Sequence, residues 1–180
     1  MAIEIEKKYR LTPQDYEAIE SDLNELGAKF TGEDREENII YGGESLDAQG
    51  AVIRLRLIGE RSILTFKKRI QSETSAKHQI EYETEVQDAY AIRSILDGLG
   101  LKPRLIYEKR RRKWRFRSVE IVLDELPFGL YMEIEGPLMS IAEAEMLLSA
   151  EDLTPELETY PRLTSKFGVQ NENVIEARFG

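Results

Sequence analysis

Apolar and polar residues alternate along eight stretches of the chain. Between residues 51 and 58, for example, Leu55 and Leu57 alternate with Arg54 and Arg56. Because successive side chains of a strand point to opposite faces, this alternation predicts a strand with one apolar and one charged face. The eight predicted strands cover residues 3–10, 36–42, 51–58, 62–69, 79–87, 104–117, 119–125 and 130–136.

Short groups of turn-forming residues separate several of these strands. Gly59-Glu60 follows the third predicted strand, Arg117-Ser118 follows the sixth, and Pro127-Phe128-Gly129 follows the seventh. Glycine and proline favour the backbone angles of tight turns, and tight turns connect antiparallel neighbours. The pattern therefore predicts an antiparallel sheet.

Helical periodicity appears between the strands. Thr12 and Pro13 supply an N-cap and a first-turn proline for one helix, and Gly27 ends it. An amphipathic helix must bury its apolar stripe, and the apolar sheet faces are available for this. The other helix signals are Asp88 as an N-cap, a capping box formed by Ser140 and Glu143, and a weaker pattern over residues 154–167.

Length and hydropathy predict one domain, residues 1–180, in the cytoplasm. The chain has 180 residues, which suits a single domain with a substantial core. It contains no apolar run of about 18 residues that would indicate a membrane span, and no signal-peptide pattern at its start. We therefore expect no membrane association. No pattern specifies an oligomeric state, and a homodimer is compatible with the sequence.

The sequence contains no cysteine and one histidine, His78, which lies in a polar run expected to form a solvated loop. Disulfides, thiolate metal sites and cysteine nucleophiles are therefore excluded. Any bound metal must be held mainly by carboxylates. Oxygen ligands suit hard cations, so the sequence favours Mg²⁺ or Mn²⁺ over zinc.

A basic segment, KRRRKWRFR at residues 109–117, stands out in an acidic chain. The formal net charge is −9, yet seven of these nine residues are basic. Trp114 and Phe116 could stack on nucleic-acid bases, but the net negative charge argues against a nucleic-acid partner. A helical, solvated run is a further alternative, although the flanking aromatic and β-branched residues favour a strand.

The charged strand faces have two interpretations. In an ordinary antiparallel sheet each charged face would meet solvent. If the helices instead cover the apolar faces and the sheet closes, the fold is α+β, with an eight-stranded antiparallel β-barrel whose lumen is charged. The lumen would then hold Glu4, Glu6, Glu81, Glu83, Glu85, Asp124, Glu133 and Glu135 opposite Lys8, Arg54, Arg56, Lys67, Lys109, Arg111 and Lys113.

So many enclosed charges require counterions of both signs. A metal-chelated phosphate chain supplies them, because Mg²⁺ bridges phosphate oxygens and arginine or lysine neutralises the remaining charge. The basic segment at residues 109–117 would then form one wall of a polyphosphate site.

These motifs resemble the CYTH domain family, which is named after class IV adenylyl cyclase and thiamine triphosphatase. Its members are also called triphosphate tunnel metalloenzymes. The matching elements occur in the family's order from residue 3 to about residue 136, and ETYPRL resembles the family's C-terminal segment. They are Glu4-x-Glu6-x-Lys8, Arg54-x-Arg56, Lys67, the acidic strand EYETEV, Lys109-x-Arg111, Asp124, and a final Glu133-x-Glu135.

The resemblance implies a β-tunnel that binds a triphosphate with Mg²⁺ or Mn²⁺. The implied metal ligands are Glu4, Glu6, Asp124, Glu133 and Glu135. The implied phosphate-binding residues are Lys8, Arg54, Arg56, Lys67, Lys109 and Arg111. The implied catalytic residues are Glu4, Glu6, Lys8, Glu81 and Glu83. Glu85, Lys113 and Lys166 have no assigned role.

Three functions fit this resemblance. The first choice is hydrolysis of inorganic triphosphate or of an organic triphosphate such as ATP or thiamine triphosphate. The alternative is a class IV adenylyl cyclase, in which the ribose 3′-hydroxyl of ATP replaces water as the nucleophile. A noncatalytic polyphosphate- or nucleotide-binding module is third. A protein that only binds anions would need few of these carboxylates, yet the sequence contains the full acidic set.

Overall fold

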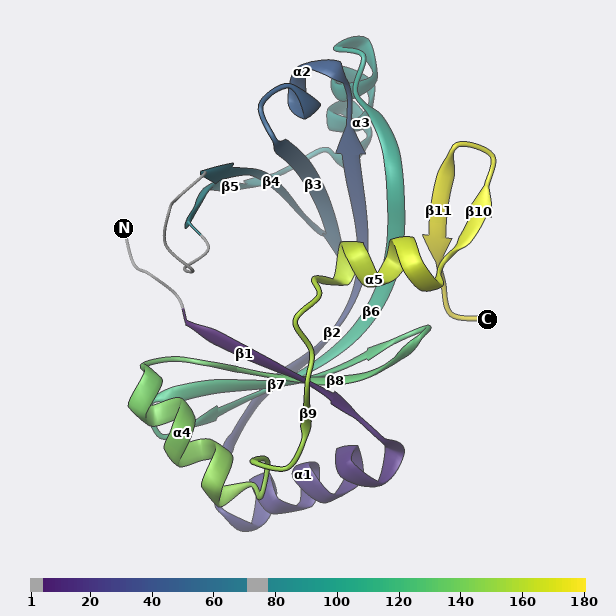
Figure 1. Ribbon diagram of the computed structural model, residues 1–180. Coiled ribbons are helices and arrows are strands. Elements are labelled where there is room, and N and C mark those ends of the chain that lie inside the picture. The colour runs from purple at the N-terminus through teal and green to yellow at the C-terminus, as the bar shows by residue number, and fades with distance from the viewer. Residues whose placement is uncertain (1–4, 71–77) are drawn as a thin grey trace. The chain divides into compact units, whose positions relative to one another are not determined.

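The computed structural model describes residues 5–70 and 78–180, which form a largely antiparallel sheet with five helices (Figure 1). The strands are β1 (Glu6–Leu11), β2 (Lys29–Gly42), β3 (Ala51–Ile58), β4 (Arg61–Ile70), β5 (His78–Val86), β6 (Lys102–Phe116), β7 (Val119–Leu126), β8 (Gly129–Glu135), β9 (Thr154–Pro155), β10 (Val169–Asn171) and β11 (Val174–Ala177). The helices are α1 (Pro13–Glu25), α2 (Glu44–Asp47), α3 (Ala89–Gly98), α4 (Leu138–Leu147) and α5 (Tyr160–Phe167). The α+β class and the antiparallel sheet are confirmed.

The chain divides into two compact units, and strands β2 and β6 each contribute to both. Unit 1 comprises Met1–Arg35 and Lys109–Thr159, and unit 2 comprises Glu36–Glu108 and Tyr160–Gly180. The single domain over residues 1–180 stays a prediction.

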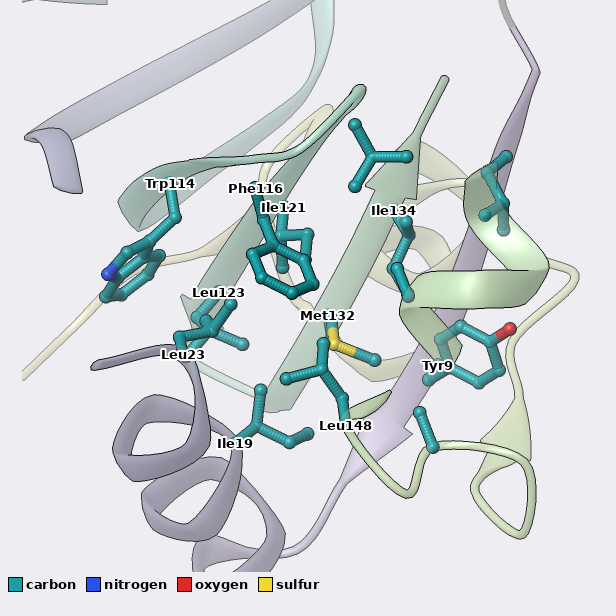
Figure 2. Packing of buried hydrophobic residues seen from close by; sticks show 14 of the residues in the cluster. Tyr9, Ile19, Leu23, Trp114, Phe116, Ile121, Leu123, Met132, Ile134 and Leu148 are labelled. Carbon is teal, nitrogen blue, oxygen red and sulfur yellow. The ribbon is translucent and has the colours of Figure 1, made fainter. Parts of the chain in front are cut away.

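Unit 1 has one apolar sheet face, which α1 and α4 cover (Figure 1). Figure 2 shows Ile19 and Leu23 of α1 on the same side as Leu123 and Met132 of the sheet, and all four side chains are buried. Ile19 and Leu23 are four residues apart, so they share one face of the helix. The opposite face of these strands is therefore left for polar groups.

Unit 2 repeats this arrangement with a separate core. Ile39 and Leu55 point from neighbouring strands toward Leu46 of α2 and Leu96 of α3. Residues Asn38, Arg54 and Arg56 alternate with these apolar positions and so belong to the other face. The predicted division into apolar faces under helices and charged faces opposite them is correct in both units.

The predicted closed, eight-stranded barrel is wrong in two respects. Over the described residues the sheet has eleven strands, and its hydrogen-bonded order is β5-β4-β3-β2-β6-β7-β8-β1-β9, with β11 pairing β6 and β10. The path is not closed, because the outer edge of β1 pairs with the short strand β9 and β5 has only β4 as a partner in the described ranges. All eight predicted strands match β1–β8, and the three additional strands have two to four residues.

Helix α1 begins and ends where the sequence predicts. The Thr12 hydroxyl accepts a hydrogen bond from the Asp15 amide at 3.1 Å, and the Asp15 carboxylate accepts one from the Thr12 amide at 2.9 Å. Gly27 follows the helix with φ 73°, and the Ala28 amide bonds the Leu23 carbonyl at 2.8 Å. This reciprocal cap and glycine-based end fix where the chain enters and leaves the helix.

Helix α3 also follows its predicted cap, whereas α4 and α5 differ from prediction. The Asp88 carboxylate accepts a hydrogen bond from the Ala91 amide at 2.9 Å. Helix α4 begins at Leu138, before Ser140, and Glu143 pairs with Arg117 instead of closing a capping box. Helix α5 covers only part of the range 154–167, which also contains β9. No helix in the described part of the chain is long and apolar enough to cross a membrane.

Two methionines of unit 1 provide a matched test of its core. Met132 is 0 % exposed on β8, and Met139 is 81 % exposed on α4. Met132→Ala should lower the free energy of unfolding by about 2–5 kcal/mol, because it removes buried surface and leaves a cavity. Met139→Ala should change it by less than about 0.5 kcal/mol. Urea denaturation of both variants checks this, and equal losses would contradict the assigned core.

Candidate functional site

The polar face of unit 1 is built by strands β1, β8, β7 and β6. Lys8 lies across from Glu133, Tyr131 across from Asp124, and Asp124 across from Arg111. Since residues in register share a face, four strands present one continuous polar surface opposite the core. Tyr131, which the sequence analysis did not select, is fully buried within it, and its hydroxyl accepts a hydrogen bond from Arg10 at 3.2 Å.

Buried ion pairs connect the charges of this face. Arg111 binds both carboxylate oxygens of Asp124, at 2.7 and 2.6 Å, and donates to Glu133 at 2.5 Å. Lys8 lies 3.2 Å from Glu133, and Lys109 lies 3.7 Å from Asp124. Asp124, Lys109 and Glu133 are all buried. Removing one member would leave an uncompensated buried charge, so these groups need either each other or a charged ligand.

Glu6 is more open to solvent than Asp124 and Glu133 of the same face. Its side chain is 45 % exposed, and its carboxylate lies 3.9 Å from Lys8. Partial burial and the negative charge of Glu133 raise its pKa, while Lys8 and Arg111 act in the opposite direction. Glu135, directly across the strand pair, adds a further repulsion. A bound cation would relieve this repulsion.

The acidic set fits a hard divalent cation by its chemistry. Glu6, Asp124, Glu133 and Glu135 offer only carboxylate oxygens, which Mg²⁺ and Mn²⁺ prefer. Within residues 5–70 and 78–180, no three acidic or histidine side chains already converge on a common point. Glu4 and the side chain of His78 lie outside what the structure describes. The metal ligands therefore stay a prediction.

The polar face of unit 2 is built by strands β2, β3, β4 and β5. Arg54 lies across from Thr65, and Thr65 lies across from Glu83. Arg54 donates a hydrogen bond to the Thr65 hydroxyl at 3.3 Å, and that hydroxyl donates to Glu83 at 3.0 Å. Lys67 and Glu81 form the next cross-strand pair at 2.9 Å. The predicted basic and acidic residues of β3, β4 and β5 therefore share one face.

Arg54 lies 3.6 Å from the Glu83 carboxylate, but one of its own donors has no acceptor within the described part of the chain. Its Nε atom is buried and has no hydrogen-bond partner among the described residues. Burial and the neighbouring positive charge of Arg56 lower its pKa, although Tyr107, Glu81 and Glu83 partly compensate. A buried donor without an acceptor is costly, and two adjacent guanidinium groups repel. An anion bound at this face would satisfy both groups.

Glu36 and Asn38 of β2 were not selected from the sequence, although both are buried on this face. Asn38 lies across from Arg56, and Glu36 is two residues away on the same side. Both residues fall in the predicted strand 36–42, so alternation gave a usable signal. Their pairing with Arg56 depends on the register between strands, which alternation does not specify.

The residues without an assigned role lie in ordinary surface contacts. Glu85 pairs with the exposed Arg61 at 3.0 Å, and that hydrogen bond lowers its pKa. Lys113 pairs with Asp34 at 2.6 Å. Lys166, on α5, lies 5.1 Å from the centre of the Phe167 ring.

The aromatic residues of the basic segment do not offer a nucleic-acid surface. Trp114 and Phe116 are 1 % and 4 % exposed, within the core of unit 1. Arg112 lies over the Trp114 ring, 5.2 Å from its centre. Rings buried in this way are unavailable for stacking on bases, which removes the observation that favoured that alternative.

A pocket of about 490 Å³ in unit 2 lies away from the predicted residues. Its lining includes Ile39 and Tyr41 of β2, Arg93 of α3 and Arg178 near the C-terminus. Ile39 and Tyr41 alternate with Asn38, so they point away from the Arg54 and Arg56 face. This pocket therefore does not coincide with the candidate site.

These features define a class of protein: an α+β protein with antiparallel strands that presents paired acidic and basic groups suited to a polyanion and a divalent cation. A model of the CYTH domain matches residues 2–165, and the chain belongs to the CYTH family. The resemblance inferred from the sequence is therefore confirmed. No curated protein matches the chain.

Solved structures share this fold. The PH1012 protein from Pyrococcus horikoshii OT3 has a TM-score of 0.74 and 25 % identity, with 89 % of this chain and 99 % of that chain covered. A putative adenylate cyclase from Vibrio parahaemolyticus has a TM-score of 0.67 and 20 % identity, covering 90 % and 97 %. The putative adenylyl cyclase HpAC1 from Hippeastrum has a TM-score of 0.69 and 16 % identity, covering 93 % and 98 %, and is described as having a dominant triphosphatase activity.

Proposed function

We propose that this protein is a divalent-metal-dependent enzyme that hydrolyses inorganic triphosphate or a related organic triphosphate. The observation that carries the proposal is the buried, unpartnered Nε of Arg54 beside the second guanidinium of Arg56. Membership of the CYTH family supports triphosphate chemistry, and the carboxylates of unit 1 supply groups that a simple anion-binding protein does not need.

The basic residues have the role of binding and orienting phosphate oxygens. Arg54 and Arg56 offer guanidinium donors, which suit phosphate better than ammonium groups do because they bind two oxygens at once. Arg111 and Glu133 neutralise each other in the structure. A phosphate of the ligand would replace Glu133 as the partner of Arg111, and a bound cation would replace Arg111 as the partner of Glu133. The remaining phosphate-binding residues are Lys8, Lys67 and Lys109.

The carboxylates have the role of holding the cation and directing water. Glu6, Asp124, Glu133 and Glu135 would hold Mg²⁺ or Mn²⁺, together with Glu4, which matches the family motif. The bound cation would polarise the phosphoryl group and neutralise its charge. Glu6, Glu81 and Glu83 are the candidates for accepting hydrogen bonds from the attacking water. The water oxygen forms a bond to phosphorus, the bond to the leaving phosphate oxygen breaks, and the basic groups stabilise the charge that develops.

Adenylyl cyclase activity is the second candidate, because the solved structures from Vibrio parahaemolyticus and Hippeastrum both carry that putative description. The two reactions use the same electrostatics but different nucleophiles, since cyclisation requires the ribose 3′-hydroxyl to attack the α-phosphorus. Fold alone does not distinguish them.

One experiment separates these reactions. Purified protein is incubated with inorganic triphosphate, ATP or thiamine triphosphate and either Mg²⁺ or Mn²⁺, and phosphate, pyrophosphate and cyclic AMP are measured. We expect metal-dependent release of phosphate, abolished by EDTA. Cyclic AMP formed together with equimolar pyrophosphate would establish the cyclase instead. Absence of turnover with all three substrates would favour a noncatalytic binding module.

A further inference from the structure

Asn38 holds one side of the Arg56 guanidinium. The two residues lie directly across from each other on β2 and β3, and Asn38 is fully buried. The Arg56 Nε donates a hydrogen bond to the Asn38 Oδ1 at 3.3 Å. This contact fixes the guanidinium by its inner nitrogen.

Glu36 in turn holds Asn38. The Asn38 Nδ2 donates a hydrogen bond to the Glu36 Oε2 at 3.2 Å, and the same oxygen lies 3.5 Å from the Arg56 Nε. Glu36 is 4 % exposed, so its charge is compensated inside the protein by this network. The amide therefore has its oxygen directed at Arg56 and its nitrogen directed at Glu36.

The contacts with Asn38 and Glu36 leave the two terminal nitrogens of Arg56, its Nη atoms, available. Neither Nη atom of Arg56 donates a hydrogen bond to any residue in the described ranges, and the side chain is 20 % exposed. Arg54 is held in the opposite way. Its Nη2 donates a hydrogen bond to Thr65, and its Nε has no partner among the described residues. A guanidinium held by Nε with two free Nη donors is arranged for bidentate binding of a phosphate group.

We propose that Asn38 and Glu36 are positioning residues that orient Arg56 toward a phosphate of the bound triphosphate. The proposal rests on the proposed function and extends it to two residues that contact Arg56 instead of the substrate. Fixing the guanidinium before binding avoids the rotamer entropy that a free arginine loses on contact with the ligand.

The test measures binding directly, without metal and without turnover. Inorganic triphosphate is titrated into the full-length protein in EDTA by calorimetry. Asn38→Ala should weaken the affinity by about 10-fold, which is the effect expected for loss of a hydrogen bond to a charged group. Ser62→Ala is the matched control, because Ser62 is a buried polar residue of β4 in the same unit, across from Leu57 on the apolar side. It should bind as the wild type does.

A double-mutant cycle separates positioning from a structural effect. If Asn38 acts through Arg56, adding Asn38→Ala to the Arg56→Ala variant should change the affinity by no more than about twofold. An equal loss in both backgrounds, or no loss in either, would overturn the inference while leaving the proposed function intact. Absence of triphosphate binding by the wild-type protein in EDTA would overturn the positioning inference, and absence of metal-dependent turnover as well would overturn the proposed function.

Folding is controlled with a second variant. Asn38→Leu fills a similar volume without providing an acceptor, so it should preserve packing better than alanine while giving the same loss of affinity. Thermal unfolding by circular dichroism shows which variants are folded at the titration temperature. A folded Asn38→Leu variant with wild-type affinity would refute the positioning role.

Discussion

Glu6→Gln is expected to lower kcat/KM for triphosphate hydrolysis by about 100-fold or more, as is typical for loss of a group that directs a nucleophile. The substitution keeps the size of the side chain and removes only its charge. Steady-state kinetics in Mg²⁺ and in Mn²⁺ measure the effect. Glu17→Gln, at an exposed position of α1, is the control and should retain wild-type activity.

The same variant separates a functional charge from a structural one. Partial burial and Glu133 raise the pKa of Glu6 above its ordinary value of 4.5, so ionisation of Glu6 opposes folding. At neutral pH, Glu6→Gln should therefore unfold at a temperature equal to or above that of the wild type. The unfolded state loses its proton at lower pH than the native state, so this advantage should disappear as the pH falls below 4.5. Loss of folding at neutral pH would contradict the placement of Glu6 on a ligand-binding face.

The sequence predicted the long elements well because their patterns repeat several times. Strand β3 begins and ends as alternation predicts, and α1 has both of its predicted end signals. Helix α2 and strands β9, β10 and β11 have two to four residues, which is too short for any periodicity to register. The closed barrel failed for a related reason. Alternation identifies faces, but it carries no information about which strand edges pair.

The candidate site was predicted to a similar extent. Alternation correctly placed Lys8 and Glu133 on one face of unit 1, and Arg54 and Lys67 on one face of unit 2, and the family motifs suggested their roles. It did not identify Asn38, because alternation gives the face of a residue within a strand but not the residue that lies across from it. The residues proposed to bind ligands were therefore readable from the sequence, whereas the residue proposed to position Arg56 required the register between strands.

Arg56→Ala is expected to reduce kcat/KM by about 100-fold or more, since it removes a guanidinium whose two Nη atoms donate to no residue among 5–70 and 78–180 and are proposed to bind phosphate. It also removes the positive charge beside Glu36 and the donor that bonds the Asn38 oxygen, so a modest loss of thermal stability should accompany the kinetic effect. Arg61→Ala is the matched control, because Arg61 forms an exposed pair with Glu85 in the same unit and should be nearly neutral in both respects.

The loss of kcat/KM in Arg56→Ala should exceed what its loss of stability explains. Arg56→Lys retains a positive charge but lacks the planar fork, so it should recover the stability of the wild type more fully than its activity. If Arg56→Lys recovers activity as fully as it recovers stability, Arg56 contributes only its charge. In that case the Asn38 and Glu36 contacts would have no orientation to maintain, and the geometry of the fork would be irrelevant to triphosphate binding.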